Sequence, residues 1–179
     1  MKIFVTGSSG FIGFHLSKKL LEKGHSVHGY DSMNKYYDVK IKNARLKILK
    51  KYKKFSFTKN KLENKKNLSK SILKFKPTTI IHLAAQAGVR YSIENPKAYM
   101  DSNIIGTYNI IELGKKIRIK HLLIASSSSV YGANKKLPFT EIDKTETQLS
   151  LYAATKKSTE SIAHSVSYTH LRAHETDSY

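Results

Sequence analysis

The 179-residue sequence contains no cysteine, and its 13 acidic residues stand against 32 lysines and arginines, giving a formal net charge of +19. Without cysteine the chain can form neither a disulfide nor a thiolate metal site, which fits a reducing compartment. No apolar run approaches the ~20 residues that span a bilayer, and the N-terminus shows no basic leader with a cleavage site. We therefore expect a cytoplasmic protein without a membrane span.

The excess of basic residues is concentrated between Lys40 and Lys76, where Glu63 is the only acid. Such a run can form a nucleic-acid surface. It can equally be the solvated face of a lysine-rich protein, and aromatic residues such as Phe55 and Phe75 fall where a core would need them. We favour the second interpretation and expect no nucleic-acid partner, although the charge favours an anionic ligand.

Short apolar runs alternate with amphipathic stretches along the chain, which predicts strands alternating with helices in a Rossmann-like, doubly wound parallel sheet of the α/β class. The expected strands are 2–6, 26–30, 55–58, 79–83 and 121–126. The expected helices are 11–23, 39–51, 66–75 and 96–116, with a last helix that begins near Leu149.

The first expected turn, from Gly7 to Gly13, has the spacing G-x-x-G-x-x-G between a buried strand and a helix. Glycines there allow a tight turn and bring bare backbone beside a pyrophosphate at the helix N-terminus. Asp31 ends the second strand, where a carboxylate accepts hydrogen bonds from ribose hydroxyls and repels a 2′-phosphate. Glycines and a turn aspartate also occur without a ligand, but their order predicts an NAD site.

Two further patterns follow the later strands. A serine run, Ser126 to Ser129, succeeds the expected fifth strand; such runs are often loops, but this one lies at the edge where ligands bind. Tyr152 and Lys156 are four residues apart and share one face of the last helix. A nearby ammonium favours phenolate over phenol, so we expect Tyr152 to serve as a general base near neutral pH.

These motifs together resemble the extended short-chain dehydrogenase/reductases, the nucleotide-sugar epimerase/dehydratase family. The resemblance covers residues 1–165 and rests on Thr6 to Gly13, His82-Leu83-Ala84-Ala85, Ser127 to Gly132 and Tyr152-x-x-x-Lys156. Within that family, Asn34 to Asp38, Gln86 to Ser92 and Ser150 to Lys157 are most similar to the UDP-glucuronate 4-epimerases.

The resemblance implies an NAD-dependent epimerase that oxidises a UDP-uronic acid at C4 and reduces it again on the other face. It implies three catalytic residues: Tyr152, Lys156 and Ser127. It implies NAD contacts from Gly7, Gly10, Phe11, Ile12, Gly13, Asp31, Leu62, Leu83, Ala84, Ala85, Tyr152 and Lys156. It implies substrate contacts from Gln86, Arg90, Ser127, Ser128 and Ser129, and no metal.

One local feature separates the activities within this family. Dehydratases carry an acidic pair directly after the catalytic hydroxyl residue, whereas this chain has Ser128 and Ser129, which favours epimerisation over elimination. A 4-epimerase of another sugar, such as UDP-N-acetylglucosamine, and a non-catalytic NAD-binding fragment remain alternatives. The resemblance also implies a homodimer of the full-length protein.

The chain departs from the family pattern in two places. Lys61 stands where relatives carry an acid near the adenine, so either the backbone at Leu62 holds that ring or NAD binds more weakly than in relatives. Relatives exceed 300 residues, so we expect the sheet to be truncated before its last strands and before a C-terminal substrate lobe. The segment 166–179 no longer follows the family; its His170 and His174 have no third ligand, so we expect no metal there.

Overall fold

The computed structural model describes residues 1–171, and side chains through Tyr168. His174 and most of the segment 166–179 therefore lie outside the described residues, as does the side chain of His170. The chain forms two compact units: the first combines Met1–Ala85 with Ile105–Ala125, and the second combines Gln86–Ile104 with the residues from Ser126 onward.

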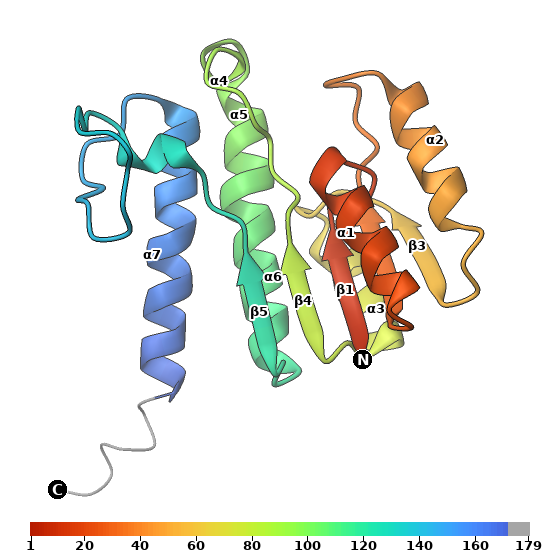
Figure 1. Cartoon of the computed structure of the whole chain (residues 1–179). Helices are drawn as coiled ribbons and strands as arrows, with labels where there is room; N and C mark the ends of the chain where they lie inside the picture. Colours follow the sequence, from red (N-terminus) through yellow and green to blue (C-terminus); the bar gives the residue numbers. More distant parts are fainter. Residues whose placement is uncertain (172–179) are drawn as a thin grey trace, which may run out of the picture. The chain divides into compact units, whose positions relative to one another are not determined.

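The first unit is built on five parallel strands in the order β3-β2-β1-β4-β5. Their bounds are β1 Lys2–Thr6, β2 Ser26–Asp31, β3 Phe55–Lys59, β4 Thr79–His82 and β5 His121–Ile124. Four helices connect and cover them: α1 Phe11–Glu22, α2 Val39–Leu49, α3 Lys65–Phe75 and α6 Gly106–Lys116 (Figure 1). The prediction of a doubly wound parallel sheet is confirmed.

The central strands β1 and β2 are buried on both faces, because side chains alternate along each strand and helices pack on either side. In β1, Ile3 and Val5 pack with Phe14 of α1 and Leu49 of α2. Phe4 points to the opposite face, where it joins a second cluster with side chains of α3 and α6. The order of strands places the carboxyl ends of β1, β2 and β4 next to one another, which is where an open parallel sheet presents its ligand site.

The second unit contains mainly helices. They are α4 Tyr91–Glu94, α5 Pro96–Tyr99, the π-helix η1 Met100–Ile105, the 3₁₀ helix η2 Ser128–Tyr131 and α7 Leu151–Leu171. The single helix predicted over 96–116 is therefore interrupted: α5 begins at Pro96 as expected, but a π-helical turn separates it from α6. The expected last helix is confirmed and begins two residues later than Leu149.

No helix among residues 1–171 combines the length and apolar character that a bilayer crossing requires. Within the same residues, no group of three or more histidines and acids is placed to hold a metal ion.

Candidate functional site

The glycine turn, Gly7 to Gly13, joins β1 to α1 and leaves backbone N–H groups facing outward. Gly7 adopts a left-handed φ of 71°, and a Cβ there would lie 2.9 Å from the backbone nitrogen of Ala84. Gly10 precedes α1 in an extended conformation and provides no side-chain cap. The N–H groups of Phe11, Ile12 and Gly13 therefore have no acceptor within the helix, and the turn is suited to an anion.

Asp31 at the end of β2 is joined to this turn by one side-chain hydrogen bond. Its Oδ2 accepts from the backbone N–H of Ser9 at 3.0 Å, and its Oδ1 accepts from the N–H of Met33 at 2.8 Å. Each carboxylate oxygen has a further lone pair for a donor, although the side chain is only 6% exposed. A ribose diol could supply such donors, so turn and carboxylate together fit a dinucleotide.

A relay of buried side chains fixes the backbone after β4 next to the glycine turn. The hydroxyl of Thr6 accepts from the N–H groups of Leu83 and Ala84, both at 3.1 Å, and lies 2.7 Å from Nδ1 of His82. Nε2 of His82 lies 2.9 Å from the hydroxyl of Thr107 on α6. Because Thr6 accepts twice, its own hydrogen is available for Nδ1, which assigns the imidazole proton to Nε2.

The expected adenine contact lies on a buried segment after β3. Leu62 is 6% exposed, and its carbonyl accepts from Nδ2 of Asn109 at 3.1 Å. The ammonium of Lys61, at the position where relatives carry an acid, lies 3.4 Å from a carboxylate oxygen of Glu63. This cation therefore forms an ion pair with a residue two positions along the chain. The structure thus gathers Gly7, Asp31, Leu83 and Ala84 around one strand edge, and Leu62 belongs to the core of the same unit.

The predicted catalytic residues belong to the second unit. Tyr152 and Lys156 lie on α7, and the Tyr152 ring meets the ring of Tyr99 edge-on at 6.0 Å. Lys156 is 5% exposed; burial lowers the pKa of its ammonium, and the nearby carboxylate of Glu160 partly opposes this. Ser127 caps η2, with its hydroxyl accepting from the N–H of Ser129 at 3.2 Å.

The helix η2 packs against α7, so the serines and the tyrosine belong to one packed group of elements. Ser128 and Ser129 form the first turn of η2, and no carboxylate occupies these two positions. The predicted substrate residues differ in their surroundings: Gln86 is 4% exposed, whereas Arg90 is exposed at the start of α4.

Asn103 is a residue whose role the sequence analysis missed. Its Oδ1 accepts from the N–H of Gln86 at 2.7 Å, and its Nδ2 donates to the Gln86 carbonyl and to the Thr155 hydroxyl, each at 3.0 Å. It lies in the π-helix η1, a distortion that often marks functional sites. Asn103 therefore links the segment after β4 to Thr155 of α7, which is the residue directly before Lys156.

Comparisons with known proteins agree with this geometry. The sequence matches the family described as GDP-mannose 4,6 dehydratase over residues 4–173. It is 50% identical over 179 residues to a probable UDP-glucuronate 4-epimerase of Rhizobium meliloti, covering 100% of this chain and 52% of that protein. It is 55% identical over 171 residues to the protein CapI of Staphylococcus aureus, covering 96% and 50%.

A solved structure shares the fold. The UDP-glucuronic acid 4-epimerase of Bacillus cereus, crystallised with UDP-glucuronic acid and NAD, superposes with a TM-score of 0.86 at 33% identity, covering 94% of this chain and 52% of that one. The chain thus spans about half the length of the curated relatives it matches. The resemblance noted in the sequence is confirmed: the chain belongs to the GDP-mannose 4,6 dehydratase family of NAD-dependent epimerases and dehydratases.

Proposed function

We propose that the longer protein to which this sequence corresponds is an NAD-dependent 4-epimerase that interconverts UDP-glucuronate and UDP-galacturonate. The observation that carries the proposal is the catalytic set of the second unit. Ser127 caps η2, and Tyr152 and Lys156 lie on α7, while hydroxyls stand at Ser128 and Ser129, where elimination of water would need carboxylates. Two relatives with this activity in their names support the choice of sugar.

The first unit supplies the features that NAD requires. The free N–H groups of Phe11, Ile12 and Gly13 would receive the pyrophosphate, and Asp31 would accept from the adenosine ribose. Asp31 also carries the charge that disfavours a 2′-phosphate. When bound, NAD supplies a reversible hydride acceptor, so epimerisation needs no external oxidant.

The chain's own residues move and hold the proton. Tyr152 would take the proton from the C4 hydroxyl of the sugar and return it once the opposite face of the ring is presented. Lys156 would stabilise the phenolate form of Tyr152 by its charge. Ser127 would donate a hydrogen bond to the reacting oxygen, and Ser128 and Ser129 would help to hold the carboxylate of the uronic acid.

The first prediction tests this function directly. We expect the full-length protein with Tyr152→Phe to lose at least ~10²-fold in turnover, because a general base contributes about 10²–10⁴-fold. Conversion of UDP-glucuronate to UDP-galacturonate is followed by separation of the two sugars, and NAD content is measured in parallel. Tyr168→Phe, on the exposed side of the same helix, should change neither.

The outcomes separate the alternatives. Activity on UDP-N-acetylglucosamine but not UDP-glucuronate would identify the other epimerase, and release of water would identify a dehydratase. We expect the 179-residue chain alone, which spans half the length of its relatives, to bind NAD weakly and to turn over little. NAD retention without turnover in the full-length protein would favour the non-catalytic alternative.

We further propose that the full-length protein is a cytoplasmic homodimer. Support for the dimer comes from the first unit, where the apolar side chains of Ile105 and Tyr108 are 45% and 43% exposed at the start of α6. Residues three apart on a helix share a face, so these two side chains form an apolar stripe suited to a second copy.

A further inference from the structure

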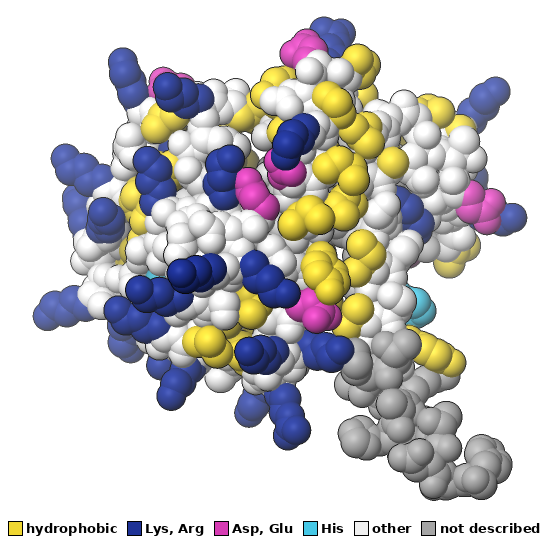
Figure 2. Space-filling view, turned by 180° about the vertical axis from the view of Figure 1, so that it is seen from behind, with side chains coloured by type: hydrophobic (Ala, Val, Ile, Leu, Met, Phe, Trp, Pro, Cys, Tyr) yellow, Lys and Arg dark blue, Asp and Glu magenta, His cyan; other side chains and the backbone are white. Residues whose placement is uncertain are grey.

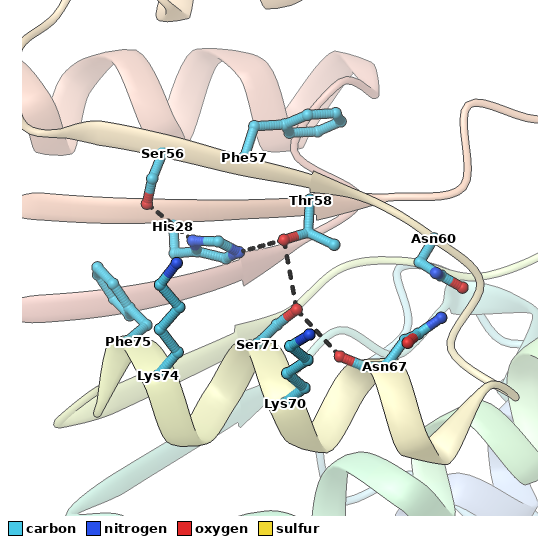
Figure 3. Close-up of a pocket in the computed structure, with 10 residues that line it drawn as sticks. All are labelled: His28, Ser56, Phe57, Thr58, Asn60, Asn67, Lys70, Ser71, Lys74 and Phe75. Carbon is cyan, nitrogen blue, oxygen red and sulfur yellow. Dashed lines mark hydrogen bonds between the residues drawn. The ribbon is translucent and has the colours of Figure 1, made fainter.

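A groove lies between the edge strand β3 and helix α3, within the first unit and apart from the glycine turn. Its volume is about 510 Å³, a size typical of small-molecule sites. It is defined here as the α3–β3 groove, which is lined by Ser56, Thr58, Lys70, Ser71 and Lys74 above His28 of β2 (Figure 3). None of the residues that line the groove belongs to the candidate dinucleotide site, which includes Asp31, Leu83 and Ala84.

The lining of the α3–β3 groove carries positive charge without an acid. Lys70 and Lys74 are four residues apart on α3 and therefore project from the same side of the helix, and Figure 3 shows Lys74 extending toward His28. None of the residues that line the groove is an aspartate or glutamate. On the molecular face in Figure 2, Lys and Arg side chains likewise project with few acids among them. An anion in this groove would be attracted by the two lysines and would not be repelled by a carboxylate of the lining.

The floor of the groove offers a hydrogen-bond donor as well. His28 lies between two hydroxyls, with Nδ1 2.7 Å from Oγ of Ser56 and Nε2 3.0 Å from Oγ1 of Thr58. Burial, together with the charge of Lys74, lowers the pKa of His28 to about 4, so the imidazole is neutral at pH 7.

A neutral imidazole has one N–H and one acceptor nitrogen. It can therefore use the hydrogen of only one of the two flanking hydroxyls, whichever tautomer it adopts. The hydroxyl of Ser71 lies 3.3 Å from Oγ1 of Thr58 and 3.0 Å from the carbonyl oxygen of Asn67. Its single hydrogen can go to the carbonyl, so its oxygen can accept the hydrogen of Thr58. In the tautomer with the proton on Nδ1, His28 donates to Ser56 and accepts from Thr58, and the hydrogen of Ser56 is left for an acceptor in the groove.

From this arrangement we propose that the α3–β3 groove is a second binding site, separate from the dinucleotide site, for a small molecule that carries a phosphate group. Phosphate provides acceptor oxygens and, near neutral pH, close to two negative charges for the two lysines. Inorganic phosphate fills only part of 510 Å³, so a phosphate monoester with an organic part fits the groove better.

The test is a titration of the isotope-labelled 179-residue chain with inorganic phosphate, followed by amide NMR at constant ionic strength maintained with chloride. We expect saturable shifts at Ser56, Thr58 and Ser71. The double variant Lys70→Gln/Lys74→Gln should weaken the dissociation constant at least about tenfold, because both charge-assisted contacts are lost. The control Lys47→Gln/Lys51→Gln removes the same charge at and just beyond the end of α2, outside the groove, and should leave the dissociation constant unchanged.

A second arm repeats the titration with glucose 1-phosphate. If glucose 1-phosphate binds more tightly than inorganic phosphate, the occupant of the groove is a phosphate ester. If the two ligands bind equally, the occupant is the free anion. Phosphate bound at the glycine turn is recognised separately by shifts at Phe11 to Gly13. The proposal is overturned if shifts at the groove do not saturate, or if the two double variants weaken binding equally, since either result means diffuse attraction to a basic surface.

Discussion

At Gly13 the first turn of α1 crosses the glycine turn so closely that no side chain fits. A Cβ at Gly13 would overlap the carbonyl oxygen of Gly7, which is backbone and cannot move aside as a side chain can. We predict that Gly13→Ala lowers the free energy of unfolding by about 1–3 kcal/mol, as overpacking does, and weakens NAD binding. Urea denaturation and NAD titration measure the two effects.

Gly114 offers a matched control in α6. A Cβ there would lie 3.2 Å from Cγ2 of Ile119, a flexible side chain, and alanine favours the helix by about 1 kcal/mol. Gly114→Ala should therefore be close to neutral in stability and without effect on NAD. Equal effects of the two substitutions would show that the crossing at Gly13 is not tight.

His28 makes the stability of the first unit depend on pH. Its pKa is lowered from 6.5 to about 4 by burial and by Lys74, so below pH 6.5 the unfolded chain binds a proton that the folded chain does not. Its contribution is complete above pH 6.5 and is lost as the pH falls toward 4, by about 2 kcal/mol at pH 5.

The check is the free energy of unfolding at pH 7.5 and pH 5 for the native chain and His28→Asn. The variant should lose this part of the pH dependence, whereas His121→Asn, at an exposed position of β5, should retain it. Identical slopes for the native chain and His28→Asn would contradict the lowered pKa.

At the scale of elements, Asn103 joins η1 to α7 and to the segment that follows β4. Asn103→Ala leaves the N–H and carbonyl of Gln86 without their partner in a buried place, and we predict a cost of about 2–4 kcal/mol in unfolding free energy. Thr155→Val removes the acceptor for Asn103 and the donor to the carbonyl of Tyr152 at 2.8 Å, and it should cost about 1–2 kcal/mol.

A double-mutant cycle separates the bond from other effects of these substitutions. If Asn103 and Thr155 interact as the 3.0 Å distance indicates, the double variant costs less than the two single variants together. Additive costs would mean that this bond does not stabilise the second unit.

The elements that the sequence predicted are those whose signals are local. Apolar runs identified all five strands, and Pro96 marked the start of α5 correctly. The π-helix was not predicted because Asn103 bonds to Gln86 and Thr155, which are 17 and 52 residues away. Hydrophobic periodicity contains no information on such contacts, so one continuous helix was expected.

The same distinction holds for the site. Spacing alone indicated the glycine turn and Asp31, and in the structure a hydrogen bond from the N–H of Ser9 to Asp31 joins them. The relay from Thr6 through His82 to Thr107 links residues 76 and 25 apart, so neither its existence nor its effect on Leu83 could be predicted. The α3–β3 groove likewise arises from the packing of β3 against α3.

At the scale of the whole molecule, the net charge of +19 predicts how the protein behaves toward polyanions. We predict retention on DNA at low salt and release near physiological ionic strength, because non-specific contacts exchange for counterions. Elution from immobilised DNA of two unrelated sequences over a salt gradient measures this. Tight binding to one sequence at about 0.15 M salt would instead indicate a specific nucleic-acid surface.

The two units are interleaved in the chain, and this has a consequence for synthesis on the ribosome. The sheet of the first unit lacks β5 until Ala125 has emerged, although its first 85 residues are made long before. The segment Gln86–Ile104 likewise cannot complete its hydrogen bonds until α7 has been synthesised, because Asn103 donates to Thr155 of that helix. Nascent chains stalled before residue 125 should therefore remain protease-sensitive, and neither unit can be obtained by trimming one end of the gene.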